Sequence, residues 1–455
     1  MYKRSFFKSL PTAVRSIAAS GILAAFLVSC GEGTTEPDSD AGSSASVEKE
    51  AVSAMETFPS ANGETVANAE MRECIVYSPE DRSDGICYVY TERVYCDGNP
   101  EPETERVVLF RAPANAVNVV IPDGVTEIGS GVFRDCVELE SVMIPDSVRV
   151  IGKSAFQNCT NLKSLTLPDG VTIIGESAFQ NCTGLESVAI PNSVSLISGL
   201  AFLHLPNLKT VTIPVHASIE GRAFEGCPKL ESVTLAEGGT VAPPREDAYI
   251  GFAAFANCSR LRQFEFPKGI RKISLSAFSK CDELICIEIP DGVTEIGKNA
   301  FWGCMRLESV VIPNSVDLIP EQAFQNLSSC SSLRSVTIPV HASIGARAFE
   351  GCTKLESVTL TEGGTIVPMR EDASIGEGAF AFCRSLKRIE FPEGTRSIEA
   401  GAFSGCAALK EITIPESVTE IADEAFQGTP CEESVRRQME SRRAAARPET
   451  ADPAR

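Results

Sequence analysis

The sequence predicts a repeat solenoid of about 13 coils, and a recurring residue pair is the first observation behind this prediction. An isoleucine followed five residues later by a phenylalanine occurs 13 times; most copies lie 23 residues apart, with one spacing of 22, one of 25 and two of 31. A unit of this length cannot bury its apolar face alone and has to stack on its neighbours. The pairs are Ile128/Phe133, Ile151/Phe156, Ile174/Phe179, Ile197/Phe202, Ile219/Phe224, Ile250/Phe255, Ile273/Phe278, Ile296/Phe301, Ile319/Phe324, Ile344/Phe349, Ile375/Phe380, Ile398/Phe403 and Ile421/Phe426.

A short apolar stretch and a turn complete each unit, as in the copy at Leu162–Cys182, LKSLTLPDGVTIIGESAFQNC. The opening Leu-x-x-Leu-x-Leu alternates inward and outward positions, which predicts one short β-strand per coil. The proline that usually follows lacks a backbone N–H, so it ends the strand and starts a turn. The inward Ile, Phe, Cys and Leu positions are therefore predicted to form continuous buried ladders.

The combined pattern LxSLTLPxxVTxIGxxAFxxC resembles the BspA-type leucine-rich repeat of bacterial surface proteins, over roughly Val117 to Gly428. The resemblance implies a leucine-rich repeat solenoid with one short parallel β-strand per coil and a short helical turn or irregular convex side. It also implies an exported, adhesin-like protein that binds host matrix proteins or other cells. The family brings no catalytic motif, so neither an enzyme activity nor a cofactor is expected.

The first 30 residues are typical of a bacterial export signal. Basic residues precede an apolar run that is too short for a transmembrane span, and the run ends at Leu27-Val28-Ser29-Cys30. This ending resembles the lipoprotein lipobox, which implies a signal peptide over residues 1–29 and lipid attachment at Cys30. Ordinary signal cleavage at a nearby small residue is the alternative. Residues 30–68 are rich in Gly, Ser, Thr, Glu and Asp, which predicts a disordered acidic tether.

Residues 69–115 are predicted to form an N-terminal β-rich cap. Short strands separated by Asp-Gly turns are expected at Cys74–Tyr77, Ile86–Tyr90 and Arg106–Phe110. The segment also holds four of the six tyrosines, namely Tyr77, Tyr88, Tyr90 and Tyr95. It is interpreted either as a cover for the first coil or as a tyrosine-rich binding surface.

The solenoid is predicted over residues 116–430 and contains a duplicated block of several repeats. The sequence from Leu208 matches the sequence from Leu333, and the match continues through both 31-residue units. These long units carry inserts in place of the usual proline, Ala236–Gly251 and Thr361–Gly376. The inserts are interpreted either as tolerated loops copied with the block or as binding loops.

After Phe426 the pattern stops, and residues 431–455 are predicted to form a C-terminal cap helix and a disordered tail. The helix is expected over Glu432–Ala446, where it would cover the last coil.

The 17 cysteines are predicted to be mainly free buried thiols. Ten stand three residues after a ladder phenylalanine: Cys136, Cys159, Cys182, Cys227, Cys258, Cys281, Cys304, Cys352, Cys383 and Cys406. Because Leu205 and Leu327 occupy the same position in other copies, the position favours a small apolar side chain. Disulfides between neighbouring coils are the alternative in an exported protein. Whether two of Cys74, Cys87 and Cys96 form a bridge stays open.

The composition argues against several kinds of partner. A formal charge of -20 and a pI near 4.8 disfavour nucleic acid and anionic membrane surfaces, so membrane contact is expected only through the lipid anchor. The three histidines do not cluster, no Cys-x2-Cys pair occurs, and the Asp-Gly turns lack calcium-loop spacing. No metal site is therefore expected.

Two outward rows of the predicted strands form the candidate binding surface. One row is Met143, Thr166, Ala189, Thr212, Thr234, Glu265, Glu288, Val311, Thr337, Thr359, Glu390 and Thr413; the other contains Ser141, Ser164, Ser187, Ser232, Ser309, Ser335 and Ser357. A flat, small and polar face favours a broad, weak or multivalent protein contact over a small-molecule pocket. A merely solvated sheet is the alternative.

These features predict a lipid-anchored protein of the bacterial cell envelope that binds other proteins, in adhesion to host matrix or to other cells. The outer membrane is the expected location, with the repeats exposed at the surface. A periplasm-facing lipoprotein with a structural or scaffolding role is the alternative. The sequence leaves the ligand itself open.

Overall fold

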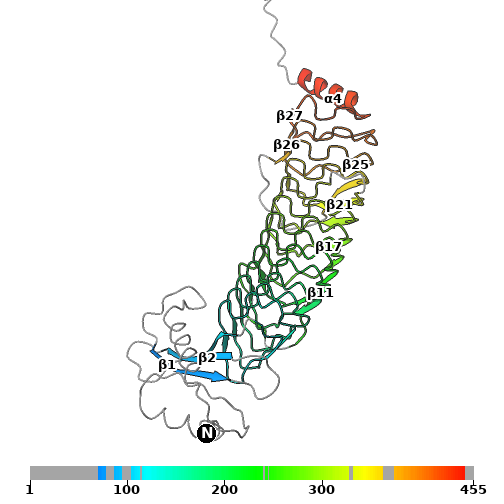
Figure 1. The fold of residues 1–455 in the computed structure, drawn as a ribbon. Coiled ribbons are helices and arrows are strands. Elements are labelled where there is room, and N and C mark those ends of the chain that lie inside the picture. The colour runs from blue at the N-terminus through cyan, green and yellow to red at the C-terminus, as the bar shows by residue number, and fades with distance from the viewer. Residues whose placement is uncertain are drawn as a thin grey trace, which may run out of the picture. The chain divides into compact units, whose positions relative to one another are not determined.

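The structure is a computed structural model, and it describes residues 70–77, 87–94, 104–112, 115–238, 241–243, 245–326, 331–361 and 373–445. The chain divides into two compact units, Met1–Leu185 and Glu186–Arg455, with the boundary inside the repeats. In each unit the described repeats are parallel strands stacked as a solenoid, which confirms the predicted fold class of about 13 coils (Figure 1). Cys30, the predicted signal peptide and the predicted tether lie outside the described residues.

The first unit begins with three strands that precede the repeats: β1 (Glu70–Tyr77), β2 (Cys87–Val94) and β3 (Thr104–Arg111). β1 pairs with β2 and β2 with β3, both antiparallel, and β3 then pairs in parallel with β5 (Glu127–Ile128) of the first coil. These strands are longer than predicted, because cross-strand pairing extends them into polar residues such as Glu70 and Arg93. The edge of the first coil is thereby paired rather than open.

The repeats of the first unit contribute two rows of short strands. The rows are β5 (Glu127–Ile128), β7 (Val150–Ile151) and β8 (Ile173–Ile174), and β4 (Asn118–Val120) and β6 (Ser141–Met143). All pairs within each row are parallel and in register.

The second unit repeats the same arrangement. One row contains β10 (Leu196–Ile197), β12 (Ser218–Ile219), β14 (Tyr249–Ile250), β16 (Lys272–Ile273), β18 (Glu295–Ile296), β20 (Leu318–Ile319), β22 (Ser343–Ile344), β24 (Ala373–Ile375), β26 (Thr395–Ile398) and β27 (Glu420–Ile421). The other contains β9 (Ser187–Ala189), β11 (Thr210–Ile213), β13 (Ser232–Leu235), β15 (Gln263–Phe264), β17 (Cys286–Glu288), β19 (Ser309–Val311), β21 (Ser335–Ile338), β23 (Ser357–Leu360) and β25 (Arg388–Ile389).

The row of short strands that end at the ladder isoleucines, such as β5 and β10, was not predicted. The expected strand after the leucines is present in most coils, and a second, mostly two-residue strand ends at the ladder isoleucine. A two-residue strand has no alternation to detect. It forms because the backbone on either side of the isoleucine bonds to the coil before it, as when Gly251 N–H donates to Ile219 O at 2.7 Å.

The ladder side chains form the core. Phe156, Phe224 and Phe349 are 0% exposed, and neighbouring ladder rings stack with centroids 4.8–5.5 Å apart. The spacing matches the ~4.8 Å between hydrogen-bonded strands, so one ring per coil fills the interior continuously.

The turn around each phenylalanine is not a helix. Its backbone N–H groups donate alternately within the turn and to the next coil: Phe156 N to Ala178 O at 2.8 Å, Gln157 N to Ser154 O at 3.1 Å, and Asn158 N to Gln180 O at 2.8 Å. This alternation requires left-handed backbone at two positions per turn, where φ is 54° at Ser154 and 64° at Asn158. The irregular side that the family resemblance implied is therefore a hydrogen-bonded turn.

The ladder cysteines are buried and free, as predicted. Cys159 Sγ donates to Phe133 O of the preceding coil at 3.0 Å, and Cys182 Sγ donates to Phe156 O at 3.0 Å. Burial raises the pKa of Cys304 and of Cys406 to about 12. Because the thiolate is the reactive form, these thiols are held unreactive at neutral pH.

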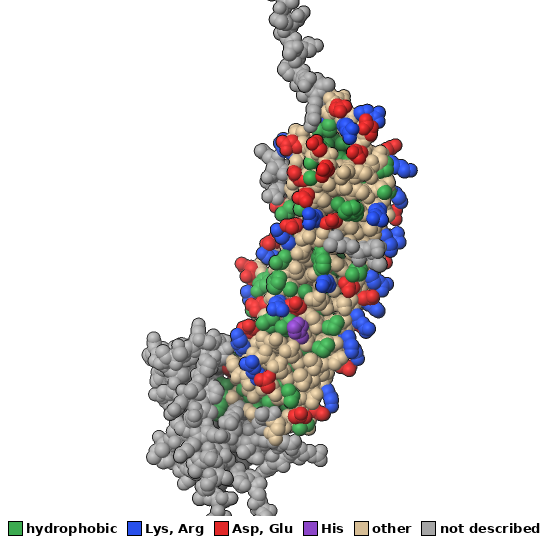
Figure 2. Space-filling model, turned by 45° about the horizontal axis from the view of Figure 1, so that its top comes forward, with side chains coloured by type: hydrophobic (Ala, Val, Ile, Leu, Met, Phe, Trp, Pro, Cys, Tyr) green, Lys and Arg blue, Asp and Glu red, His purple; other side chains and the backbone are tan. Residues whose placement is uncertain are grey.

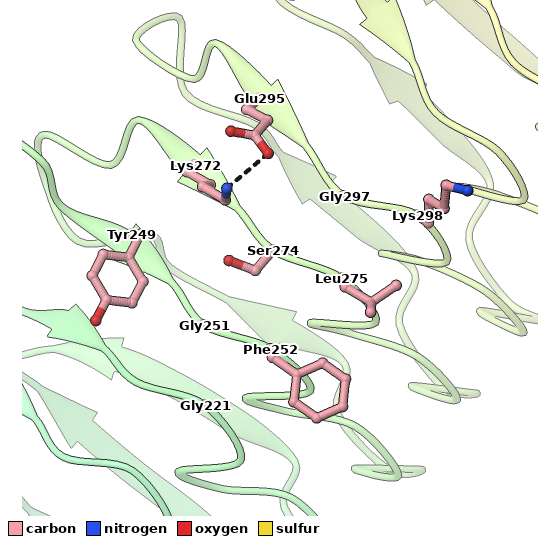
Figure 3. Close-up of a pocket in the computed structure, with 10 residues that line it drawn as sticks. All are labelled: Gly221, Tyr249, Gly251, Phe252, Lys272, Ser274, Leu275, Glu295, Gly297 and Lys298. Carbon is pink, nitrogen blue, oxygen red and sulfur yellow. Dashed lines mark ion pairs between the residues drawn. The ribbon is translucent and has the colours of Figure 1, made fainter.

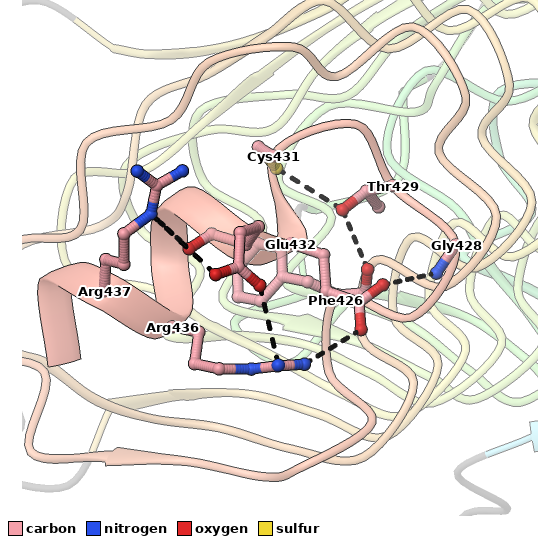
Figure 4. Close-up of polar contacts among 8 residues, drawn as sticks. Phe426, Gly428, Thr429, Cys431, Glu432, Arg436 and Arg437 are labelled. Carbon is pink, nitrogen blue, oxygen red and sulfur yellow. Dashed lines mark hydrogen bonds and ion pairs between the residues drawn. The ribbon is translucent and has the colours of Figure 1, made fainter. Parts of the chain in front are cut away.

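The predicted C-terminal helix is present as α4 (Glu432–Ala445) and contacts the last coil of the second unit. Gln438 Nε2 donates to Ile412 O at 3.3 Å, and Arg442 donates to Pro415 O at 2.9 Å and to Ile414 O at 2.5 Å. These carbonyls have no following coil to pair with, so the helix supplies their donors. At its start, Glu432 accepts from Gly428 N–H at 3.0 Å and pairs with Arg436 (Figure 4).

Candidate functional site

The predicted outward rows do face outward. Met143 and Val311 are the most exposed large hydrophobic residues of the described chain, at 65% and 58%, and no residue of either row is buried. Within the sheets β9–β15 and β17–β25 the paired strands keep their register, so Thr212 lies opposite Thr234, and Thr337 opposite Thr359. The hydroxyls of these two pairs are 3.5 and 3.3 Å apart.

A flanking row of charges was missed by the sequence analysis. The residues that follow the first leucine of each coil are Glu140, Lys163, Glu186, Lys209, Glu231, Arg262, Ile285, Glu308, Arg334, Glu356, Lys387 and Lys410. Signs alternate along most of this row, and neighbours pair: Lys163–Glu140 at 2.8 Å in the first unit, and Lys209–Glu186 at 2.8 Å in the second. The alternating charges become visible in the sequence when the residue at this one position is compared across all coils.

Figure 2 shows the resulting surface on one face of the molecule: basic and acidic side chains border the repeats, and hydrophobic side chains form small separate patches. Exposed ion pairs contribute little stability, about 0–1 kcal/mol each. The charge row therefore matters more as a polar border to the strand face than as a source of stability.

A buried side chain, together with backbone bonds such as Ala242 N–H to Asn192 O at 2.7 Å, attaches the first insert to the solenoid. Asn192, which is 5% exposed, donates from Nδ2 to Ala236 O at 3.2 Å and to Gly238 O at 2.7 Å, and its Oδ1 accepts from Val215 N at 2.9 Å. In the second insert Thr361 bonds to the equivalent Asn314. Residues 362–372 lie outside the described residues, so a binding role of that insert stays a prediction.

A shallow hollow of about 500 Å³ lies in the second unit, where the first insert returns to the repeats (Figure 3). Its lining residues come from the turn after β12 and from β14, β16, β18 and the turns that follow them: Gly221, Tyr249, Gly251, Phe252, Lys272, Ser274, Leu275, Glu295, Gly297 and Lys298. Phe252 is 49% exposed and Leu275 is 43% exposed, so the wall that they form presents apolar surface to solvent.

The hollow runs between two rows of side chains. Tyr249, Lys272 and Glu295 each precede a ladder isoleucine and lie in register on adjacent strands. Phe252 and Leu275 belong to the other row, two residues after the isoleucine (Figure 3). Glycine and serine positions separate the rows and leave backbone as the floor.

The polar groups of the hollow are largely occupied. Lys272 Nζ and Glu295 Oε1 are 2.8 Å apart, and Lys298 pairs with Glu321 at 2.7 Å. On the floor, the Ser274 N–H donates to Ile250 O at 2.8 Å. Burial, followed by the charge of Glu220, raises the pKa of Tyr249. The contact surface left to a ligand is therefore mainly apolar.

The structure describes only some of the tyrosines and cysteines of the predicted N-terminal cap. Tyr77, Tyr88 and Tyr90 lie on β1 and β2, whereas Tyr95 and Cys96 lie outside the described residues. In the β1–β2 register Cys74 lies opposite Tyr90, and Cys87 lies opposite Tyr77, so these two cysteines are not cross-strand neighbours.

Among the described residues, no group of three or more His, Cys, Asp or Glu side chains could hold a metal ion. In the same part of the chain, no helix has both the length and the apolar character needed to cross a membrane.

The repeats have known counterparts. A model of the BspA type leucine rich repeat region matches 6 copies over residues 108–240, 248–371 and 373–438. A leucine-rich repeat protein from Bacteroides ovatus is 24% identical with a TM-score of 0.51, over 74% of this chain and 91% of that one. A leucine rich cell surface protein from Faecalibacterium prausnitzii is 28% identical with a TM-score of 0.38, over 79% and 93%. No curated protein matches the chain.

Proposed function

The chain belongs to the BspA type leucine rich repeat family, and from this premise we propose that it binds other proteins through the outward face of its repeats, in adhesion to host matrix or to other cells. In this proposal it lies at the bacterial cell envelope, anchored by lipid at Cys30, with the solenoid held away from the membrane by residues 30–68. Two acyl groups or more would make such an anchor stable.

The observation that carries the proposal is the contrast between interior and exterior. Side chains such as Phe224, Ile219 and Cys227 are fully buried in ladders and cannot take part in recognition. The exposed strand positions instead form in-register rows in which Thr and Ser are the most frequent residues, bordered by ion pairs. A long polar surface of repeated units suits contacts that are individually weak and collectively strong.

A binding screen tests the proposal directly. The full chain is immobilised and exposed to purified collagen, fibronectin and laminin, and binding is measured by surface plasmon resonance. We expect saturable binding to at least one matrix protein, weakened by Thr337→Lys/Thr359→Lys on the strand face. Absence of binding to every matrix protein and to intact host cells would contradict the adhesive function.

The location and the anchor need separate experiments. Protease added to intact cells should cleave the solenoid if it is surface-exposed, whereas full protection would favour the periplasm-facing scaffold.

Metabolic labelling with a fatty acid should mark the wild-type chain and not Cys30→Ala; equal labelling of both would refute the lipid site.

A further inference from the structure

The hollow beside Tyr249 and Phe252 distinguishes two otherwise similar parts of the chain. The block that begins at Leu208 is duplicated at Leu333, and the ladder residues and most insert residues are the same in both copies. Around the hollow the copies diverge. In the second copy Ser374, Glu377, Ser397 and Ala400 stand where the first copy has Tyr249, Phe252, Lys272 and Leu275.

The row of Phe252 and Leu275 also diverges in the coil before Phe252. Gly221 leaves room beside Phe252, because a Cβ there would lie 3.8 Å from Phe252 Cβ and 3.4 Å from Phe252 O. The second copy has Ala346 at this position. The first copy therefore combines the rings of Tyr249 and Phe252 with open space beside Phe252, and the second copy has neither.

An apolar side chain fits this hollow better than a sugar does. A saccharide needs several donors and acceptors that are free to converge on its hydroxyls, whereas Lys272 is paired with Glu295 and the floor N–H groups are bonded to the preceding coil. Protein–protein interfaces instead combine an apolar centre, where one side chain of the partner is buried, with a polar border, and this hollow has the same arrangement.

The charges near the aromatic walls favour a basic neighbour on the partner. Glu220 and Asp247 both act electrostatically on the Tyr249 hydroxyl. Asp247 is ion-paired with Arg245 at 3.5 Å, whereas Glu220 keeps its charge while accepting the backbone N–H of Gly199 at 2.7 Å, and the chain as a whole carries -20. In the second copy the position of Glu220 is Gly345. A Lys or Arg on the partner would thus meet complementary charge at this site.

We propose that this hollow is the anchor site of the protein-binding surface, and that it takes a bulky apolar side chain next to a Lys or Arg on a polypeptide partner. The inference rests on the proposed protein-binding function, and it adds a defined site and a defined partner chemistry. The second copy of the block has lost or never gained this site.

A peptide selection tests the site even though the partner is unidentified. A phage-displayed library of random peptides is selected on the full chain, with counter-selection on Tyr249→Ser/Phe252→Glu. Both substitutions introduce the residues that the second copy carries at these positions, so folding should be preserved. We expect the enriched peptides to share an apolar residue beside Lys or Arg, and a synthetic peptide to bind the double variant at least ~10-fold more weakly.

Phe382→Asn is the matched control. Phe382 is 48% exposed, close to the 49% of Phe252, it lies away from the hollow lining, and Asn257 occupies its position in the first copy. This variant should bind the peptide as the wild type does. Raising the salt concentration should weaken binding of the wild type, since the basic residue contributes through exposed charges.

Four results would overturn the proposal. Peptides that bind the wild type and the double variant alike would remove the hollow from the interface and leave the broader binding function standing. A glycan array with binding that depends on Tyr249 and Phe252 would assign the hollow to a saccharide. A change in sedimentation coefficient between wild type and double variant would assign it to a second copy of this chain. A selection that enriches nothing also counts against the site.

Discussion

The two copies of the duplicated block agree inside and differ outside. Ile219, Phe224 and Cys227 of the first copy and Ile344, Phe349 and Cys352 of the second are all 0–1% exposed. The outward positions around the hollow differ in size, charge and aromatic character. Stacking imposes one solution on the interior, because every coil has to match the coil before it and the coil after it. The exterior carries no such constraint, so the differences between copies indicate where recognition can lie.

The base of each insert belongs to the constrained part. Glu265 accepts from Leu235 N–H at 3.1 Å, and Glu390 accepts from Leu360 N–H at 2.9 Å. Each glutamate occupies an outward strand position in the coil after an insert, and it supplies an acceptor where the chain leaves the strand row. These two outward residues therefore have a structural role, which the sequence analysis did not separate from the candidate binding row.

The largest expected effect tests whether the two interiors are equivalent. Phe224→Ala and Phe349→Ala each remove a fully buried ring stacked between two others, at centroid distances of 5.1 Å and 5.3 Å respectively. Each should cost about 3–5 kcal/mol of unfolding free energy, measured by urea denaturation. Phe252→Ala, at an exposed ring, should stay within about 0.5 kcal/mol. Unequal losses in the two copies would break the equivalence.

The next effect concerns the close approach of coils. A Cβ at Gly251 would lie 2.5 Å from Glu220 C and from Gly221 N. Gly251→Ala should therefore destabilise the protein by about 1–3 kcal/mol, because backbone rather than a flexible side chain has to move. Gly221→Ala is the control, since the second copy already has Ala346 there. Similar melting temperatures for Gly251→Ala and the wild type would show that the coils separate easily.

A local effect is expected at the insert anchor. Asn192→Ala removes two donors to the insert and one acceptor for Val215 N–H, which leaves buried polar groups unpaired at about 1–3 kcal/mol each. Hydrogen exchange should accelerate at Val215 and over residues 236–238. Asn192→Asp keeps the acceptor, so Val215 should stay protected while the insert loosens. Unchanged exchange in both variants would mean that the insert is held by other contacts.

The interior was predictable from the sequence, because period and burial are properties of single positions repeated along the chain. The turn geometry was less predictable from the sequence. Asn158 favours left-handed backbone, but Leu200 adopts the same conformation, with φ 61°, because the stacked coils impose it. The hollow could not be read from any one unit, since Tyr249, Lys272 and Glu295 meet only after three coils stack. Reading columns across coils would have shown two glycines, a phenylalanine and a leucine in succession at Gly199, Gly221, Phe252 and Leu275.

The smallest expected effect compares two ion pairs of the charge row. A hydrogen bond from Lys209 lowers the pKa of Glu186, and a hydrogen bond from Lys387 lowers the pKa of Glu356, to which Arg334 also contributes. Lys209→Met should return the pKa of Glu186 most of the way to its ordinary value. Lys387→Met should raise the pKa of Glu356 less, because Arg334 remains 3.5 Å away.

The direction of the pH dependence follows from these lowered pKa values. A carboxyl whose pKa is lower in the folded state stabilises the fold above its unfolded pKa of ~4.3, and this contribution disappears as the pH falls through the folded pKa. Both groups are exposed, so the change belongs in an NMR titration of the glutamate carboxyls rather than in a melting curve. Equal shifts in the two variants would mean that the second cation at Glu356 is not engaged in solution.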